Sequence, residues 1–476
     1  MLRHENETVC ILFLLPHLAL SLALNNSETV SAKLWNLGNA IGESVKKLQE
    51  AGGTTQTKMV YVKRKFDKFE FKDGTLAQLS WSYENVERIE THWREEYKFF
   101  ENTIKTLLDY TEAFRLISKT YGVTEPQAEF WLSLFAQRVS KLSLPDSHGT
   151  LVDLITTFVG DLEGNPKRWR MVCWIHGVWT VDEEVTLYGG VLLRHPRQID
   201  FEEERPLELA LYLPGEDPFS AFTPRPSGIL ELERRAKDNL ELQFEVERLL
   251  TILRLFHVGA VLSLRSSWSA KSLLQFGTMS TGIRAFPIPS ESYSLTKEAV
   301  EKLHEFRARI EPLIPQELIK GGEKLDFIIT SVQRYQDALL KPESAESRIT
   351  FAMMSLEALL LRGGERELVH HLSQRVAKIL SLTGSNPEEV YTRVKRCYTI
   401  RSKFVHGEPL EKDERQYATE SVGAMLDYAR TSIVILLQAN KDVKKEQFLE
   451  LVDKSLLSQR SHDELVKAFK QSVLVY

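Results

Sequence analysis

The last third of the chain carries apolar residues three or four positions apart along five successive segments. Each segment has one apolar face, which is typical of an amphipathic helix. Short stretches with Gly, Asn or Pro separate the segments, and short connections between consecutive helices favour an up-and-down bundle. The sequence therefore predicts a helical bundle over 321–440 and a C-terminal helical extension over 441–476. The bundle helices are expected over 325–340, 345–361, 365–382, 386–405 and 414–439.

The N-terminal region, 1–165, shows the same helical period. Its most regular part is 81–117, which predicts one long amphipathic helix. The apolar stripe there consists of Val86, Ile89, Trp93, Tyr97, Phe100, Ile104, Leu107 and Leu108. A further helix is expected over 124–142, where Thr124 is a candidate N-cap. We therefore interpret 1–165 as mainly helical.

The pattern changes in the middle region, 166–320, whose role the sequence does not indicate. Short runs over 168–181, 184–196 and 207–215 are rich in β-branched and aromatic residues and are bounded by Gly and Pro. They predict a small antiparallel β region. A Pro-rich loop over 216–228 and helices over 241–261 and 296–314 complete the region. The expected fold class is α+β, mostly α.

Charge and cysteine content narrow the class of protein. The net charge is −5, so no global basic field would attract nucleic acid, and any such contact needs a local patch. Cys10, Cys173 and Cys397 are far apart and odd in number, which fits a reducing cytoplasm. The apolar run 11–24 is shorter than the ~20 residues of a membrane span. We expect either a buried N-terminal helix there or a start assigned too far upstream, in a cytoplasmic protein with no stable membrane association; export by this run is the alternative.

Motifs for cofactors and metals are absent from the sequence. There is no GxxxxGK[ST] loop, no GxGxxG after a predicted strand, no HExxH and no CxxC, so we expect neither a cofactor nor a metal. Glu367 and His370 have the i, i+3 spacing of di-iron bundle ligands. The block lacks a second such pair, and exposed helix residues are the favoured interpretation.

The segment 398–407, YTIRSKFVHG, places an arginine, a hydroxyl and an imidazole at the end of a predicted helix. The three- and four-residue spacing puts Arg401 on the same stripe as Tyr398 and Val405, which predicts a buried position for a guanidinium. Such a group needs a partner or a wet cleft. Ser402 and His406 are four apart and share a face. Gly407 is a natural C-cap, so the helix should end at His406.

These residues could act on a phosphodiester. A histidine can exchange a proton with a 2′-hydroxyl or a leaving 5′-oxygen, and an arginine can hold phosphate oxygens as charge develops. The alternative is a paired arginine and a capping histidine without chemistry. Four further cations lie close by and interleave with tyrosines, which indicates either an RNA-binding patch or a solvated helix face; they are Arg393, Lys395, Arg396 and Lys403.

Three segments together give a family resemblance: ITFAMMSLEALLL (349–361), LSQRVAKIL (372–380) and YTIRSKFVHG (398–407). Between about 325 and 440 the chain resembles the Apea-like branch of the HEPN domains. The resemblance implies a helical bundle that forms a homodimer and, in many members, cleaves RNA without a metal, in defence or RNA processing.

The family motif of Arg, a polar residue and a later His falls on Arg401, Ser402 and His406. Glu357 matches an inward glutamate that would orient Arg401, and Tyr398 would support it. Active toxins of the family often have Asn, Asp or His where this chain has Ser402. The alternative that the resemblance implies is a non-catalytic module for RNA or nucleotide binding or for dimerisation.

Overall fold

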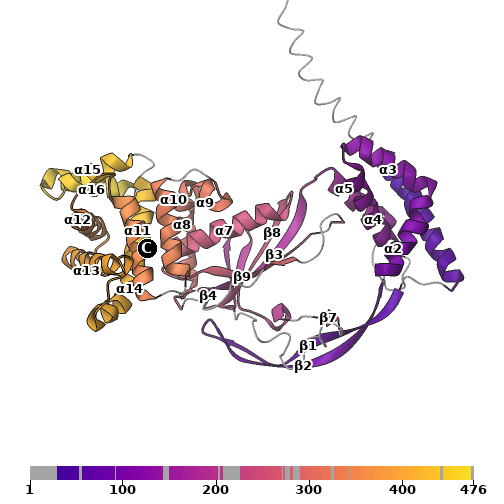
Figure 1. Cartoon of the computed structure of the whole chain (residues 1–476), viewed down its shortest axis with the longest axis horizontal. Coiled ribbons are helices and arrows are strands. Elements are labelled where there is room, and N and C mark those ends of the chain that lie inside the picture. Colours follow the sequence, from indigo (N-terminus) through magenta and orange to yellow (C-terminus); the bar gives the residue numbers. More distant parts are fainter. Residues whose placement is uncertain are drawn as a thin grey trace, which may run out of the picture.

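The computed structural model describes residues 29–52, 56–91, 93–142, 150–201, 204–206, 226–270, 272–273, 279–281, 290–322, 326–341, 344–439 and 443–472. The apolar run 11–24, Cys10 and the strand expected over 207–215 lie outside these residues. The molecule is elongated: N-terminal helices lie at one end, a β-sheet in the middle and the C-terminal bundle at the other end (Figure 1). The fold is α+β and mostly helical, as the sequence predicts. Among the described helices, none is long and apolar enough to cross a membrane.

The N-terminal region contains a long β-hairpin that the sequence interpretation missed. β1 (Gln56–Lys72) and β2 (Thr75–Thr91) pair antiparallel along their length. The long helix predicted over 81–117 is therefore wrong in its first part, where Val86 lies in β2. The turn explains the hairpin: Asp73 and Gly74 both have positive φ (49° and 73°), the backbone that a two-residue type I′ turn requires.

The remaining N-terminal elements are helical, and their apolar faces form a separate core. A helix covers 29–50. After the hairpin come α2 (Trp93–Asn102), η1 (Ile104–Thr106), α3 (Leu108–Tyr121), α4 (Glu125–Leu142) and α5 (Leu151–Leu162). α4 confirms the helix expected over 124–142. The hairpin arches from these helices toward the central sheet (Figure 1), where its Gly74 turn packs so closely against Trp179 that an added Cβ would lie 2.5 Å from the indole.

The middle region contains a six-stranded sheet in the order β10-β9-β3-β8-β6-β5, in which all neighbours are antiparallel. Its strands are β3 (Lys167–His176), β5 (Glu184–Tyr188), β6 (Val191–Arg194), β8 (Gly228–Ala236), β9 (Leu262–Ala270) and β10 (Met279–Thr281). β4 (Val178–Thr180) pairs in parallel with β11 (Tyr293–Leu295), and β7 (Glu204–Pro206) joins the hairpin. The antiparallel strands expected over 168–181 and 184–196 are confirmed in β3, β5 and β6, whereas β4, at the end of the first run, pairs in parallel.

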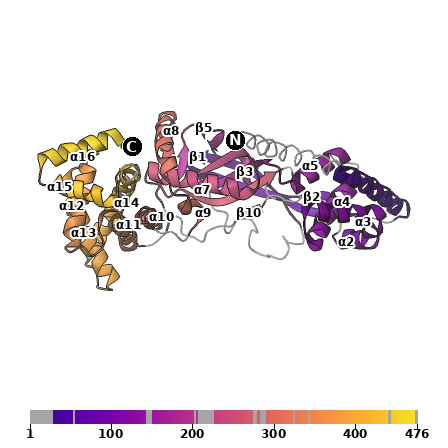
Figure 2. The same ribbon diagram turned by 90° about the horizontal axis from the view of Figure 1, so that it is seen from above.

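One face of this sheet packs against helices. Alternate residues of β3, such as Met171 and Cys173, share a core with Val246 and Leu249 of α7 (Asn239–Phe256). η2 (Gln198–Phe201) lies on the other face, where Phe201 contacts Trp174. α8 (Lys297–Ile310), η3 (Glu311–Leu313) and α9 (Gln316–Lys320) lead from the sheet into the bundle (Figure 2).

The C-terminal part is a helical bundle whose five main helices fall where the sequence predicts them. They are α10 (Phe327–Leu340), α11 (Ala345–Leu360), α12 (Leu368–Ser381), α13 (Pro387–Val405) and α14 (Lys412–Ala439), followed by α15 (Lys445–Lys454) and α16 (Gln459–Ser472). α11 is central, since it contacts α10, α12, α13 and α14. One continuous apolar core runs from Trp169 of the sheet to Leu465 of α16, so the bundle and the middle region pack as one body.

Buried polar groups of the bundle cap the C-terminal end of α7. The Tyr335 hydroxyl of α10 donates to the carbonyl of Arg254 (2.8 Å), and Arg430 of α14 donates to the carbonyls of Leu255 and Phe256 (3.0 and 3.1 Å). The last carbonyls of a helix have no partner within it. These bonds therefore satisfy the end of α7 and tie it to two bundle helices.

Candidate functional site

The helix that carries the candidate motif has well-defined ends. Asn386 caps α13, since its side chain accepts a hydrogen bond from the Glu388 N–H, and Pro387 occupies the first turn. At the other end Gly407 has a φ of +73°, its N–H donates to the Phe404 carbonyl, and the Glu408 N–H donates to the Lys403 carbonyl. This is a Schellman C-cap. It confirms that the helix ends at His406.

The buried stripe of α13 differs from the predicted one. It consists of Val390, Val394, Cys397 and Ile400, whereas Val405 is 53% exposed. Arg401 lies at the edge of this stripe, with a side chain that is 23% exposed. The prediction that Arg401 occupies the buried seam is therefore wrong in detail, because the buried stripe is offset by about one residue from the predicted one and ends at Ile400.

Arg401, Glu357 and Tyr398 come together, as the resemblance implies. Arg401 Nη2 donates to Glu357 Oε2 at 3.3 Å, and the guanidinium carbon lies 5.6 Å from the Tyr398 ring centroid. The Nε of Arg401 is buried and has no hydrogen-bond partner. Burial raises the pKa of Glu357, and Arg401 only partly opposes this. Burial also raises the pKa of Tyr398. The guanidinium is thus held by one long bond and keeps unused donors.

Ser402 and His406 lie on the outer side of the helix end. Ser402 is half-buried and His406 is exposed. The His406 N–H donates to the Ser402 carbonyl at 3.1 Å, but within the described residues neither side chain has a hydrogen-bond partner. Both are available to a ligand.

The four cations predicted to bind RNA are mostly engaged with α14. Arg393 donates to the Tyr428 hydroxyl (3.2 Å), Arg396 stacks on Tyr417 with its guanidinium carbon 3.8 Å from the ring centroid, and Lys403 pairs with Glu414 (2.7 Å). Lys395 is exposed. Contacts within the chain therefore hold three of the four cations, but only Lys403 has a close carboxylate partner, and Arg396 lies 3.6 Å from Asp413.

Glu367 and His370 do not form a metal site. Glu367 precedes α12 in a left-handed conformation, and His370 Nδ1 contacts the Tyr391 hydroxyl at 3.2 Å. Over the described ranges no group of three or more His, Cys, Asp or Glu side chains is placed to hold a metal ion. Cys173 and Cys397 are buried and unpaired.

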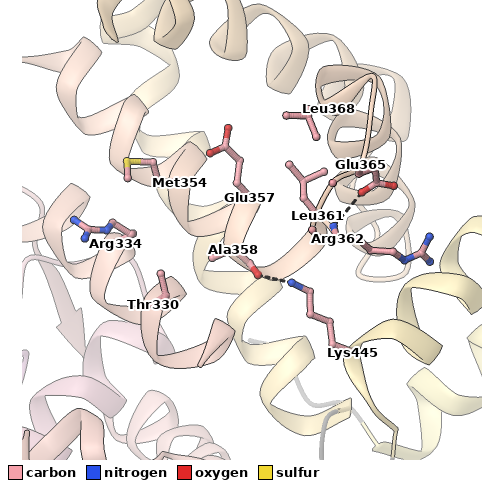
Figure 3. A pocket seen from close by; sticks show the side chains of 12 residues that line it. Thr330, Arg334, Met354, Glu357, Ala358, Leu361, Arg362, Glu365, Leu368 and Lys445 are labelled. Carbon is pink, nitrogen blue, oxygen red and sulfur yellow. Dashed lines mark hydrogen bonds between the residues drawn. The ribbon is translucent and has the colours of Figure 1, made fainter. Parts of the chain in front are cut away.

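A cavity of about 470 Å³ lies beside this site, and sequence reasoning missed it. Glu357 connects the two, since it lines the cavity and pairs with Arg401. The other lining residues come from α10, α11, the 361–367 loop, the start of α12 and the start of α15; they are Thr330, Arg334, Met354, Ala358, Leu361, Arg362, Gly363, Gly364, Glu365, Leu368 and Lys445 (Figure 3). No sequence signal joins Lys445 to α11, because the contact depends on how α15 folds back.

A buried arginine holds the loop that forms one wall of the cavity. Arg375 of α12 is 1% exposed. It forms two bonds to the Glu365 carboxylate (2.6 and 2.8 Å), two to that of Asp453 (2.7 and 2.9 Å) and one to the Leu360 carbonyl (2.7 Å). All of its guanidinium nitrogens are therefore used.

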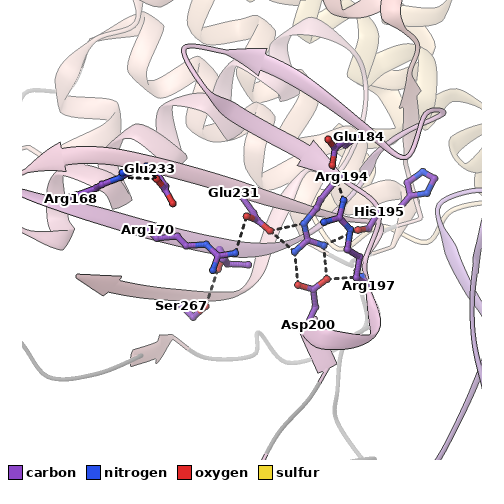
Figure 4. A network of polar contacts seen from close by, with 11 residues as sticks. Arg168, Arg170, Glu184, Arg194, His195, Arg197, Asp200, Glu231, Glu233 and Ser267 are labelled. Carbon is purple, nitrogen blue, oxygen red and sulfur yellow. Dashed lines mark hydrogen bonds and ion pairs between the residues drawn. The ribbon is translucent and has the colours of Figure 1, made fainter. Parts of the chain in front are cut away.

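A second polar cluster lies on the face of the sheet away from α7 (Figure 4). The buried guanidinium of Arg194 makes two bonds to Asp200 at 2.6 Å and pairs with Glu231 at 2.5 Å. Glu231 also pairs with Arg170 at 3.1 Å. The pKa of Glu231 is lowered because these two arginines outweigh its burial. The charges are mutually satisfied, so this cluster fixes η2 to the sheet.

Comparison with known proteins gives no relative: no protein-family model, no curated protein and no solved structure matches the chain.

Proposed function

We propose that the C-terminal bundle is a HEPN domain and that two copies of the chain together form a metal-independent endoribonuclease. The observation that carries the proposal is the state of Arg401. It is half-buried on one long bond to Glu357, has an unpartnered Nε, and belongs to the helix that ends at the exposed His406. A guanidinium with free donors and an accessible imidazole at the end of the same helix are the groups that a phosphodiester cleavage needs.

The proposed chemistry assigns one role to each residue. His406 exchanges a proton with the attacking 2′-hydroxyl or the leaving 5′-oxygen, and Arg401 neutralises the charge that develops on the phosphate oxygens. Ser402 positions the phosphate by its hydroxyl. Glu357 and Tyr398 orient Arg401. The 2′-oxygen bonds to phosphorus as the 5′-oxygen leaves, so the expected products are a 2′,3′-cyclic phosphate and a 5′-hydroxyl.

A second copy of the chain would complete the site. Arg401 and His406 are five residues apart, which on a helix places them about 140° apart around the axis and about 7.5 Å along it. One copy therefore does not direct both groups at one phosphate readily. Phe404 and Val405, between them, are 42% and 53% exposed. Two exposed apolar side chains beside the motif support pairing of two copies here.

Cleavage of RNA in EDTA tests the assignment. The full chain should cut mixed cellular RNA into fragments with cyclic phosphate ends. His406→Ala should abolish cutting, because the proton-transferring group is lost, while its circular dichroism stays that of the wild type. The matched control is His304→Ala, which removes an exposed histidine on α8 and should cut normally. An unchanged rate for His406→Ala would sink the assignment, and RNA left intact by the wild type would favour the non-catalytic module.

A further inference from the structure

The cavity beside Glu357 has the size and lining of a small-molecule site. Its volume of about 470 Å³ falls within the roughly 300–1,000 Å³ of typical ligand pockets. Met354, Leu361 and Leu368 supply apolar surface, and charged groups stand among them (Figure 3). Such a mixture suits a ligand with an apolar body and one charged group.

Lys445 determines the sign of that charge. The side chain is half-buried, its Nζ donates to the Ala358 carbonyl at 2.7 Å, and it lies 5.0 Å from the Phe327 ring centroid. No carboxylate of the described residues forms an ion pair with it. Burial lowers the pKa of Lys445. Attraction by Glu446 and Glu365 only partly offsets this burial, so an anion in the cavity would stabilise the half-buried ammonium further.

The other cations that line the cavity already have carboxylate partners. Arg362 pairs with Asp453 at 3.1 Å, and Arg334 pairs with Asp337 at 2.9 Å. An ammonium has three donors, and Lys445 uses one of them on the Ala358 carbonyl. Lys445 is therefore a lining cation that forms no ion pair with the described residues and still has free donors.

We propose that this cavity binds a small molecule in which an anionic group, phosphate or carboxylate, is attached to an apolar body. The anion lies on Lys445, and the body lies against Met354, Leu361 and Leu368. Because Glu357 lines the cavity and also holds Arg401, the ligand touches the residue that orients the guanidinium. The proposal does not require that the bundle cleaves RNA.

Calorimetric titration of the full chain with three probes tests the proposal. Phenyl phosphate and phenylacetate carry a ring and an anion, whereas orthophosphate carries the anion alone. We expect saturable binding of at least one ring-bearing probe, at least tenfold tighter than that of orthophosphate. Tighter binding of phenyl phosphate would assign the anion as phosphate, and tighter binding of phenylacetate would assign it as carboxylate.

Two variants and one matched control locate the binding. Lys445→Met should weaken the affinity for the bound probe at least tenfold. Lys444→Met, at the exposed N-cap of the same helix, should leave that affinity unchanged. Lys445→Met also removes the bond to Ala358, so Met354→Trp provides a second test that keeps the charge and fills the cavity. It should weaken the affinity for ring-bearing probes by at least tenfold as well. Absence of saturable binding to the wild type, or unchanged binding to both variants, would overturn the proposal.

Discussion

Replacing Arg375 by methionine should strongly destabilise the bundle around the 361–367 loop. The side chain is 1% exposed, and its loss leaves the partly buried carboxylate of Glu365 without its cation and that of Asp453 with Arg362 alone. Arg375 is the largest cause that lowers the pKa of Glu365 from 4.5 to about 2, and the Arg362 N–H contributes a smaller part. At 1.36 kcal/mol per pKa unit this shift corresponds to about 3 kcal/mol. Breaking a buried pair on one side typically costs about 3–5 kcal/mol, so the two figures agree.

The sign of the pH dependence follows from the same shift. A carboxylate with a depressed pKa in the folded state stabilises the fold above its unfolded pKa, and this contribution is lost as the pH falls through the folded value. The difference in free energy between wild type and Arg375→Met should therefore be full at pH 7 and shrink between about pH 4.5 and pH 2, the two values that bound the shift of Glu365.

Native-state hydrogen exchange of the α12 and α15 amides measures this local free energy. Arg366→Met is the matched control, because Arg366 is exposed on the same loop and should change exchange little. A loss below about 1 kcal/mol at pH 7, within the range of exposed pairs, would refute the reasoning. The reasoning would also be refuted if the free-energy difference between wild type and Arg375→Met did not shrink as the pH is lowered.

Three further changes have defined outcomes. Tyr335→Phe leaves the buried carbonyl of Arg254 without its donor, so melting should show a loss of about 1–3 kcal/mol; an unchanged midpoint would contradict the capping role. Gly407→Ala forces alanine to a φ of +73° at about 1–2 kcal/mol, and hydrogen exchange should quicken in the last turn of α13 but not in its first. Glu357→Gln removes a carboxyl whose pKa burial raises above 4.5. The stability of the wild type relative to this variant should fall as the pH rises from 4.5 through the raised value, because the unfolded chain releases this proton near 4.5 whereas burial makes the folded protein keep it to a higher pH. If urea unfolding shows the same stability difference at every pH, the raised pKa is excluded.

The bundle could be predicted from the sequence because local signals agree there. Each helix carries one apolar stripe, and breaks such as Pro387 and Gly407 mark its ends. The β1–β2 hairpin could not be found from periodicity alone, since Val86 and Ile89 are three apart, a spacing that favours a helix. The Asp73–Gly74 turn was the available signal. Pairing with β1 determines that 75–91 is a strand, and the local sequence pattern carries no information about that pairing.

The candidate site could be predicted only in part. The sequence indicated the motif Arg401, Ser402 and His406 and the C-cap at Gly407, and the resemblance indicated Glu357. The sequence did not indicate the partners of the nearby cations. Lys403 pairs with Glu414, and Arg393 bonds to Tyr428, and both partners lie on α14. Such contacts depend on how helices pack, and so does the cavity.

The bundle uses its buried cations in two different ways. Arg375 and Arg430 both bind carboxylates and carbonyls. The five hydrogen bonds of Arg375 use all of its guanidinium nitrogens. Arg401 and Lys445 each have one hydrogen bond in the described part of the chain, at 3.3 Å to Glu357 and 2.7 Å to a carbonyl. Arg401 and Lys445 both lie near Glu357, which pairs with Arg401 and lines the cavity together with Lys445. This corner of the bundle therefore contains cations whose donors are not fully used, and both proposals rest on that feature.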